Sequence, residues 1–305
     1  MRDTQLLEEA CLRRLIDAQL PNGGWPFIAG GKQSAIEPTA LALLALPSNF
    51  MRERYVAIRF LLEMQNPNGS WPAFAGDDKQ GSGYTGLVLY VLGRANLDGK
   101  ATNRAVHWLL DTRGWESHWL WRWKFRTTDR HVRFDPDKFG WPWMPETASW
   151  VIPTAYSLLG LKHISHASDE DLRLFRIRQG IEMLYDRICP EGGWNAGNGV
   201  VYGSVLTPHP DATAITLLAL ATEPANGFID SSLDWLERSL PGCIAPWSDS
   251  WAVLALDAHR RPTESLIHRL CLNIQSARID DCAALAVVSL AFRCAVGSNA
   301  FGASA

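Results

Sequence analysis

The sequence has no apolar run of the roughly 18 residues that a membrane-spanning helix needs. Its longest apolar run, residues 282–292, is interrupted only by Ser289 and indicates a buried helix. The N-terminus lacks the charged and then apolar build of a secretory signal. Because the net charge is only −3, the surface as a whole does not favour nucleic acid or anionic membranes, although peripheral membrane contact stays open. We therefore expect a soluble, cytoplasmic protein that binds no nucleic acid.

Motifs for metals, cofactors and common nucleophiles are also missing. There is no glycine-rich phosphate loop, no Gly-x-Ser-x-Gly elbow and no His-Glu-x-x-His pair. The cysteines are far apart and form no Cys-x-x-Cys pair, which excludes a disulfide framework or a zinc ribbon. They are Cys11, Cys189, Cys243, Cys271, Cys282 and Cys294. The sequence thus predicts neither a metal site nor a cofactor.

A short repeat is present instead. Residues 19–25 and 65–71 both read Gln-x-x-x-Gly-x-Trp, and residues 188–194 keep the Gly and Trp but lose the Gln. Each copy follows an amphipathic helical pattern and precedes an apolar segment. We interpret Trp25, Trp71 and Trp194 as structural residues that pack at turns between helices.

Amphipathic and apolar segments alternate six times along the 305 residues. The apolar segments are 37–46, 84–92, 153–161, 211–220, 249–256 and 281–290, and the amphipathic ones are 4–18, 51–64, 101–111, 169–187, 230–239 and 264–275. A helix that is apolar all round must be buried, and an amphipathic helix can cover it. The pattern predicts an all-α protein, an α6/α6 toroid of six inner and six outer helices. It forms one domain over residues 1–305, with a Trp- and Arg-rich insertion at about 113–145.

The repeats and the alternation resemble those of squalene–hopene cyclases and oxidosqualene cyclases, and also the β-subunits of protein prenyltransferases. The resemblance covers essentially the whole chain. Because squalene cyclases contain two such barrels, this chain resembles one free-standing barrel. The resemblance implies an apolar central cavity that binds an isoprenoid, and proton-initiated (class II) cyclisation as the reaction.

The resemblance also implies a proton donor. In the cyclases it is the middle Asp of Asp-x-Asp-Asp-Thr-Ala at the start of an inner helix. Residues 209–214 read His-Pro-Asp-Ala-Thr-Ala, which places Asp211 at that position and His209 beside it as its partner. Glu146 is a further catalytic candidate. Asp211 and Glu146 could instead be helix caps, since carboxylates stand at similar starts at Glu37, Asp249 and Asp281.

The insertion is the least repeat-like part of the chain, and a loop of this length is usually functional or structured. The alternation of Trp119, Trp121 and Trp123 with Leu and basic residues indicates a short extended segment. One hypothesis is a lid over the barrel mouth, whose basic residues meet an anionic head group. The alternative is a structural flap, stabilised by its tryptophans, that closes one end of the barrel. The expected substrate-binding residues are Trp121, Arg122, Arg126, Trp141, Trp143, Trp150 and Tyr202, and Lys124, Arg130 and Arg133 would add charge.

The first hypothesis for function is a terpene-cyclase-like protein. Trp141, Trp143 and Trp150 would stabilise a carbocation through cation–π attraction. Two alternatives remain open. An α/α-barrel glycosidase or lyase would need an open polar cleft with two carboxyls about 5–10 Å apart, and a scaffold that binds a lipid or a partner would need no catalytic group.

Overall fold

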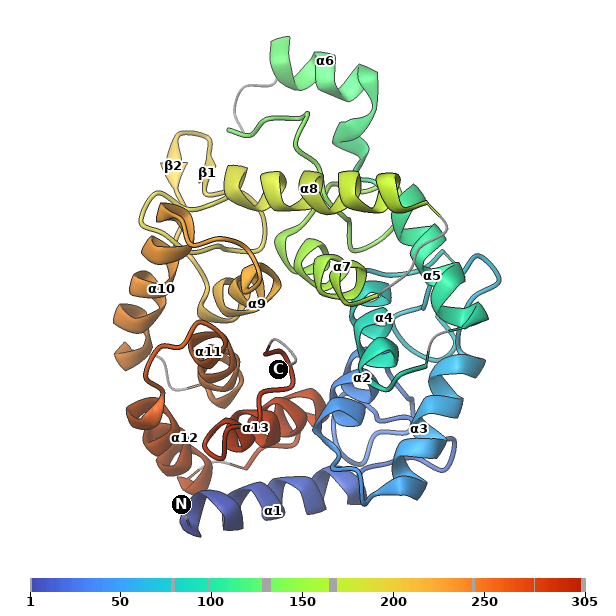
Figure 1. Cartoon of the computed structure of the whole chain (residues 1–305), viewed down its shortest axis with the longest axis vertical. Helices are drawn as coiled ribbons and strands as arrows, with labels where there is room; N and C mark the ends of the chain where they lie inside the picture. The colour runs from blue at the N-terminus through green and yellow to red at the C-terminus, as the bar shows by residue number, and fades with distance from the viewer. Residues whose placement is uncertain are drawn as a thin grey trace.

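The structure is a computed structural model that describes residues 2–77, 80–97, 99–127, 133–164, 169–242, 245–276 and 278–302. Six helices form an inner ring and six form an outer ring (Figure 1). The inner helices are α2 (Ile36–Ala45), α4 (Tyr84–Arg94), α7 (Val151–His163), α9 (Pro210–Leu220), α11 (Pro246–Ala258) and α13 (Cys282–Cys294). The outer helices are α1 (Arg2–Asp17), α3 (Met51–Glu63), α5 (Lys100–Asp111), α8 (Glu170–Asp186), α10 (Gly227–Ser239) and α12 (Glu264–Ser276).

The remaining elements are short. They are the 3-10 helices η1 (Trp115–Ser117) and η2 (Leu240–Gly242), helix α6 (Trp119–Thr127), and strands β1 (Val200–Val201) and β2 (Ser204–Val205). The two strands pair antiparallel as a hairpin. Within the described residues, no helix is both long and apolar enough to cross a membrane.

The inner ring is closed. Each inner helix packs against the next, in the order α2, α4, α7, α9, α11 and α13, and α13 packs against α2. Outer helices α3, α5, α8, α10 and α12 each pack on the inner helix that precedes or follows them, and α1 packs on α13. The predicted α6/α6 toroid is confirmed, with helix bounds within a few residues of the expected ones (Figure 1).

The repeat tryptophans join each outer helix to the following inner helix. In each copy the buried indole N–H donates to a carbonyl near the end of the outer helix. The backbone N–H of the same tryptophan donates to a threonine hydroxyl of the inner helix. The partners are Leu15 and Thr39 for Trp25, Leu61 and Thr85 for Trp71, and Leu184 and Thr213 for Trp194.

The glycine and the glutamine of the repeat also have defined structural roles. Gly23 has a φ of 92°, and a Cβ there would lie 2.2 Å from the Val56 carbonyl oxygen, so only glycine fits. The Gln19 side chain donates to the carbonyls of Gly23 and Glu53, at 2.9 and 3.1 Å. Gln65 makes the same pair of bonds, to the carbonyls of Gly69 and Ala101, so each of the two intact repeats ties the end of one outer helix to the next outer helix.

Trp141 belongs to this set, and the prediction that it lines a cavity is wrong. Its indole donates to the Leu109 carbonyl at 2.8 Å, its backbone N–H donates to the Thr154 hydroxyl at 3.0 Å, and it is only 1% exposed. Gly140 and Pro142 flank it, much as glycine and proline stand near Trp25 and Trp71 in the sequence. The sequence therefore contains a fourth copy of the repeat that the Gln-x-x-x-Gly-x-Trp pattern does not detect.

The interior of the barrel is packed with side chains. Among the described residues of the inner helices, those that reach solvent lie in the first or last turn, and the central turns are buried. Leucine, alanine and valine side chains such as Leu41, Val88 and Leu254 fill the centre. A cavity running deep into the barrel, which the sequence predicts, is therefore not seen in the described part of the chain.

The chain's own C-terminal segment covers one end of the barrel and lies at the centre of the ring (Figure 1). Phe301 is 5% exposed and packs against Tyr90 and Trp251 of two inner helices, with ring centroids 5.3 and 5.4 Å apart. The Tyr90 hydroxyl donates to the Ala300 carbonyl at 2.7 Å, and Asn299 donates to the Leu254 carbonyl at 2.9 Å. The segment therefore covers part of the carboxyl end of the barrel, and a hollow of about 290 Å³ remains beside Phe301, lined also by Lys162 and Leu218.

Replacing Phe301 by Ala is expected to destabilise the fold by about 2 kcal/mol. This is less than the loss typical of a core phenylalanine, since a terminal segment can relax into part of the space. Urea unfolding followed by circular dichroism measures the effect. Val296→Ala serves as the control because Val296 is 72% exposed in the same terminal region. Equal stability of the two variants would show that the segment does not close the barrel.

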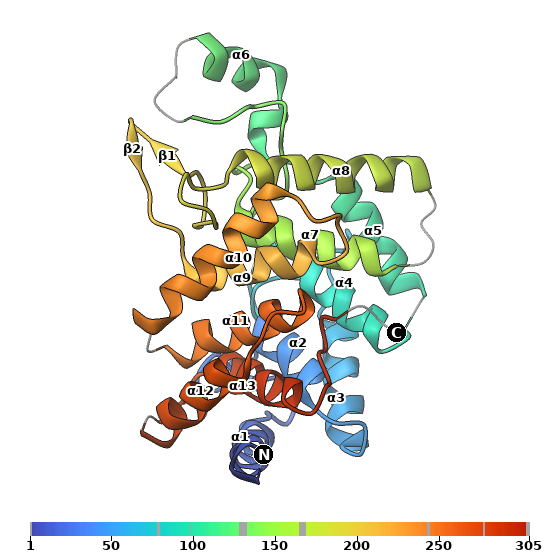
Figure 2. The same cartoon turned by 60° about the vertical axis from the view of Figure 1, so that its left-hand side comes forward.

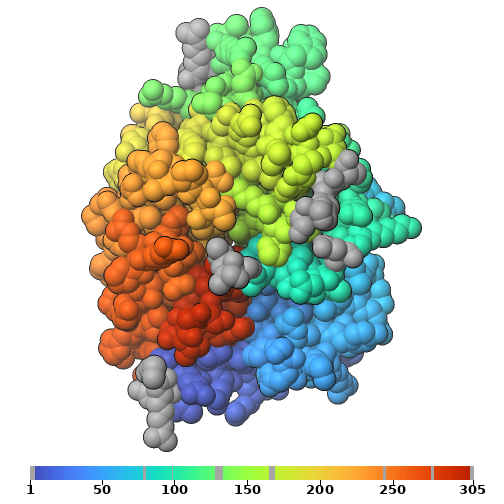
Figure 3. Space-filling view, in the orientation of Figure 1, coloured from blue at the N-terminus to red at the C-terminus, as the bar shows by residue number. Residues whose placement is uncertain are grey.

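The insertion differs from its predicted form. Residues 119–127 form helix α6 and not an extended segment, because the contacts follow helical spacing. Trp121 stacks on Phe125, and Arg122 and Arg126 both pair with Asp137. Helix α6 projects outward beyond α8 (Figures 1 and 3), so it does not cover the barrel mouth.

Candidate functional site

The amino ends of the inner helices gather at the end of the barrel opposite the C-terminal segment. Backbone hydrogen bonds join their starts in sequence around the ring. They run from Cys282 to Phe27, from Ile36 to Ala73, from Gly83 to Trp143 and from Val151 to Ala196, at 2.8–3.0 Å. We call this end the barrel mouth. It is where polar first-turn side chains of the inner helices remain partly exposed.

Glu37, in the first turn of α2, is the central polar group of the mouth. Tyr156 of α7 lies with its hydroxyl 3.4 Å from Glu37 Oε1, and Tyr84 of α4 also hydrogen-bonds to this carboxyl. Tyr156 is fully buried, while Glu37 and Tyr84 keep part of their surface open to solvent. Three different inner helices thus bring one carboxyl and two phenols together.

Burial gives Glu37 an unusual proton affinity. Desolvation raises the pKa of Glu37 to about 7, hydrogen bonds from Tyr84 and Tyr156 oppose the rise, and the nearby charge of Asp281 adds to it. Burial, and then the charge of Glu37, also raise the pKa of both phenols, which remain protonated donors. Near neutral pH, Glu37 can therefore hold a proton, and two hydroxyls stand ready to stabilise the carboxylate left after its transfer.

Aromatic rings and a second carboxyl adjoin this group. The Trp143 ring meets Tyr84 edge to face, with centroids 5.2 Å apart. Trp247 of α11 donates its indole N–H to Asp211 Oδ2 at 3.3 Å. Asp211 lies in the first turn of α9, is partly exposed, and is near enough to Tyr156 to raise the pKa of that phenol. The mouth therefore combines a carboxyl of raised pKa, a second and partly exposed carboxyl, and indole rings.

Two of the three predicted catalytic residues lie at the start of α9, and the third lies before α7. Asp211 lies at the mouth, and it is not a cap, since its side chain bonds to Trp247 and α9 is preceded by His209. His209 is exposed and makes no side-chain capping bond. Glu146 does not begin an inner helix, because it lies in an exposed turn with a φ of 63° before α7 begins at Val151.

The predicted substrate-binding residues are also dispersed. Trp143 and Trp150 precede α7 and are partly exposed at the mouth, with Trp150 bonded through its backbone N–H to the Trp141 carbonyl. Tyr202, 74% exposed, is at the turn of the β1–β2 hairpin. The other predicted residues lie elsewhere: Trp141 is in the core, Trp121, Arg122, Lys124 and Arg126 are on α6, and Arg130 lies outside the described residues.

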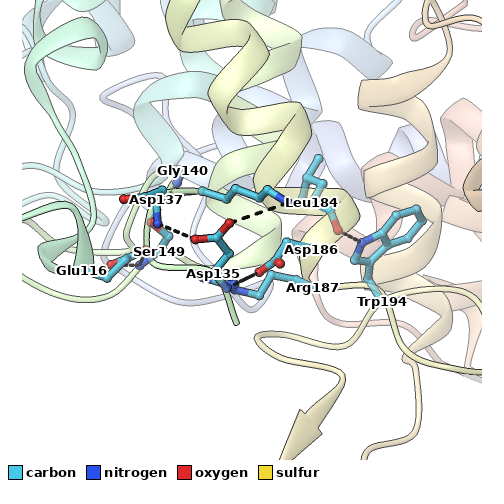
Figure 4. Close-up of polar contacts among 10 residues, drawn as sticks. Glu116, Asp135, Asp137, Gly140, Ser149, Leu184, Asp186, Arg187 and Trp194 are labelled. Atoms are coloured by element: carbon cyan, nitrogen blue, oxygen red, sulfur yellow. Dashed lines mark hydrogen bonds and ion pairs between the residues drawn. The ribbon is translucent and has the colours of Figure 1, made fainter. Parts of the chain in front are cut away.

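A polar network fixes the base of the insertion on α8 (Figure 4). The backbone N–H of Asp135 donates to Asp186 Oδ2 at 2.9 Å, and Asp186 pairs with Arg187. Glu116 accepts from the backbone N–H of Ser149 at 3.2 Å. A hollow of about 730 Å³ beside this network takes in Arg133, and positive and negative side chains both line it. The network is a structural support for the loop between α6 and α7.

The other carboxylates at inner-helix starts have structural partners. Asp249 is fully buried in α11 and accepts hydrogen bonds from Arg269 at 2.6 Å and Asn273 at 3.2 Å. Asp281 caps α13 by accepting from the Ala284 backbone N–H at 2.8 Å. Cys282 beside it is buried, and burial raises the pKa of its thiol to about 12. Within the described ranges, no three His, Cys, Asp or Glu residues are grouped so as to hold a metal ion.

Sequence comparison finds no matching protein family and no matching curated protein. Solved structures do share the fold. An α-amylase from Clostridium perfringens has a TM-score of 0.65 at 11% identity, over 94% of this chain and 97% of that one. A protein from Actinoplanes has a TM-score of 0.60 at 16% identity, over 95% of this chain and 99% of that one.

The type II terpene cyclase MstE from Scytonema has a TM-score of 0.55 at 16% identity, over 90% of this chain and 78% of that one. A variant of the same cyclase, with geranylgeranyl dihydroxybenzoate bound as its substrate, gives a TM-score of 0.56. At these identities the comparisons show the α/α-toroid fold alone, and proteins with different activities share it.

Proposed function

We propose that the protein is a terpene-cyclase-like enzyme in which Glu37 donates a proton to an isoprenoid substrate at the barrel mouth. The observation that carries this proposal is a carboxyl whose pKa is raised by burial to about 7, hydrogen-bonded to two phenols, with the Trp143 ring against one of these phenols. Strongly shifted carboxyls in such settings are frequent catalytic groups. Burying a carboxyl costs free energy of folding, and a non-catalytic scaffold does not explain why Glu37 is buried.

The acidity of Glu37 favours an oxygen atom as the proton acceptor. A carboxyl with a pKa of about 7 is partly protonated at neutral pH and can donate a proton, but it is a weak acid for an unactivated alkene. An epoxide oxygen is far more basic. In the proposed step the Glu37 O–H bond breaks, a bond from hydrogen to the epoxide oxygen forms, and the C–O bond opens to a carbocation.

The surroundings of Glu37 suit both products of this step. Tyr84 and Tyr156 would stabilise the Glu37 carboxylate by donating hydrogen bonds. The faces of Trp143 and Trp247 would attract the cation by roughly 0.5–2 kcal/mol per ring. Asp211, which accepts a hydrogen bond from Trp247, would accept the proton that ends the reaction. Because the barrel centre is packed, the substrate would lie across the mouth.

A glycosidase is the second candidate, and one observation favours it. Glycoside hydrolysis needs a carboxyl of raised pKa and a second, ionised carboxyl, typically about 5–10 Å apart. Glu37 supplies the first, and Asp211 or Asp281 could supply the second, since each influences the pKa of a group in the cluster. Glu37 would then protonate a glycosidic oxygen.

An assay with matched substrates separates the candidates. The protein is incubated with squalene epoxide, squalene, α-glucan and cello-oligosaccharides, and products are identified by mass spectrometry and by new reducing ends. We expect a cyclised product from the epoxide, with a rate that falls as pH rises through about 7, and none from Glu37→Gln. Glu146→Gln, at an exposed carboxyl, is the control and should retain the activity.

The other outcomes are equally informative. New reducing ends that disappear in Glu37→Gln would replace the cyclase with the glycosidase. Turnover that survives Glu37→Gln but not Asp211→Asn would return the acid to the residue that the sequence predicts. No product from any of these substrates would contradict both candidate enzymes.

A further inference from the structure

Helix α6 exposes large apolar side chains in an unusual concentration. Trp119 is 71% exposed, Trp123 is 58% exposed and Leu120 is 48% exposed. The repeat tryptophans of the same chain, such as Trp25 and Trp71, are fully buried. A solvent-facing cluster of two indoles and a leucine is costly in water, and such patches mark interaction sites.

The helix is held in place. The Trp115 backbone N–H donates to the Thr147 carbonyl at 3.0 Å, which closes the base of the insertion. The Trp115 ring stacks on Trp121 with centroids 4.7 Å apart, and Asp137 pairs with Arg122 and Arg126. In Figures 1 and 2, α6 projects beyond α8 and away from the ring. The insertion thus presents its apolar residues at a protruding tip.

The charge around these residues is positive. Helix α6 contains Arg122, Lys124 and Arg126 and no acidic residue, and Asp137 offsets only part of this charge. The chain as a whole carries a net charge of −3, so the basic character is local. Interleaved tryptophan and basic residues are typical of helices that lie in the interface of a membrane.

We propose that α6 docks the protein on an anionic lipid bilayer, with Trp119, Leu120 and Trp123 entering the interface. Basic side chains would then meet lipid phosphates. A helix of nine residues spans about 14 Å, too short to cross a bilayer, so it would lie on the surface. Lipid fits better than a protein partner because α6 itself interleaves indoles with cations and has no acidic or amide side chain that would pair with a polar partner surface.

Further exposed apolar side chains follow α6 along the chain. Met144, near the end of the insertion, and Trp150, just before α7, are 47% and 38% exposed. The membrane proposal does not depend on the proposed function, because its test measures binding and not turnover.

The test is co-sedimentation with large unilamellar vesicles of phosphatidylcholine, with and without about 30% of the anionic lipid phosphatidylglycerol. Wild type is expected to bind the anionic vesicles, to bind pure phosphatidylcholine less, and to shift its tryptophan emission to the blue. The variant with Trp119→Ser, Leu120→Ser and Trp123→Ser is expected to bind at least about tenfold more weakly. Lys124→Gln with Arg126→Gln should reduce the dependence on anionic lipid.

A matched control exists on α3, where Met51, Tyr55 and Leu62 are 75%, 65% and 42% exposed. Replacing these three residues by serine removes similar exposed apolar surface and should leave vesicle binding unchanged. Equal binding by the α6 variant and wild type, with both folded by circular dichroism, would overturn the proposal. So would a wild-type dimer that the α6 variant abolishes while neither protein binds vesicles.

Discussion

Replacing Glu37 by Gln is expected to make the protein more stable than wild type above pH 7 and equally stable near pH 4. The pKa of Glu37 rises from 4.5 to about 7 on folding, so the folded state binds this proton more tightly than the unfolded state. The stability that the bound proton contributes is complete below pH 4.5 and is lost as the pH rises through 7. The amide of the Glu37→Gln variant does not titrate, so the variant has no such loss.

The size of this effect follows from the shift. At most it amounts to roughly 3 kcal/mol, and because the side chain keeps some contact with solvent we expect about 2 kcal/mol. Urea unfolding at pH 4.5, 6, 7 and 8 measures it. Glu146→Gln is the control, and its stability should follow wild type at every pH because Glu146 is exposed. A Glu37→Gln protein that is less stable than wild type at pH 8 would show that the folded state stabilises the Glu37 carboxylate, which contradicts a raised pKa.

Replacing Trp141 by Ala is expected to destabilise the fold by about 4 kcal/mol, near the middle of the range for large aromatic residues in a core. The indole fills the space under α8 and donates to the Leu109 carbonyl. The ring also packs against Arg176, whose guanidinium lies 4.3 Å from the ring centre and is fully buried. Burial lowers the pKa of Arg176 to about 9, which shows that the charged guanidinium is poorly solvated. Losing the Trp141 ring would therefore remove one of the few groups that stabilise this buried charge.

The matched comparison is with Trp143, two residues along the chain. Trp143 is partly exposed and meets Tyr84 at the mouth, so Trp143→Ala should cost about 1 kcal/mol while changing turnover. Urea unfolding and the cyclisation assay are run on both variants and on Trp141→Phe. If Trp141→Phe were as stable as wild type but inactive, Trp141 would be the cavity residue that the sequence suggests.

The ring could be predicted because the sequence pattern that produces it is repeated along the whole chain. Six apolar and six amphipathic segments each add the same constraint, and a closed double ring satisfies them all. The insertion could not be predicted in the same way. Trp119, Trp121 and Trp123 alternate in the sequence, but the contact of Trp121 with Phe125 and the shared pairing of Arg122 and Arg126 favour a helix.

Glu37, the candidate acid, could not be identified from the sequence for a different reason. Glu37 is one of several carboxylates at inner-helix starts, and the sequence offers no way to rank them. Its distinguishing feature is contact with Tyr84 and Tyr156, which come from other inner helices far along the chain. Trp141 is the opposite case, since Thr154 follows it by 13 residues, one fewer than the spacing of 14 in the first two repeats, and this similarity could have revealed it.

The closed ring also decides where such a protein can change in length. In an open solenoid a unit can be added or lost at either end, and terminal units must be specially capped. Here α1 and α2 both pack against α13, so every helical pair has two neighbours and none is terminal. Gaining or losing a pair would alter the circumference and misalign every inner contact at once. A segment inserted between two helices leaves the circumference unchanged, and the excursion that carries α6 departs from the ring at such a point.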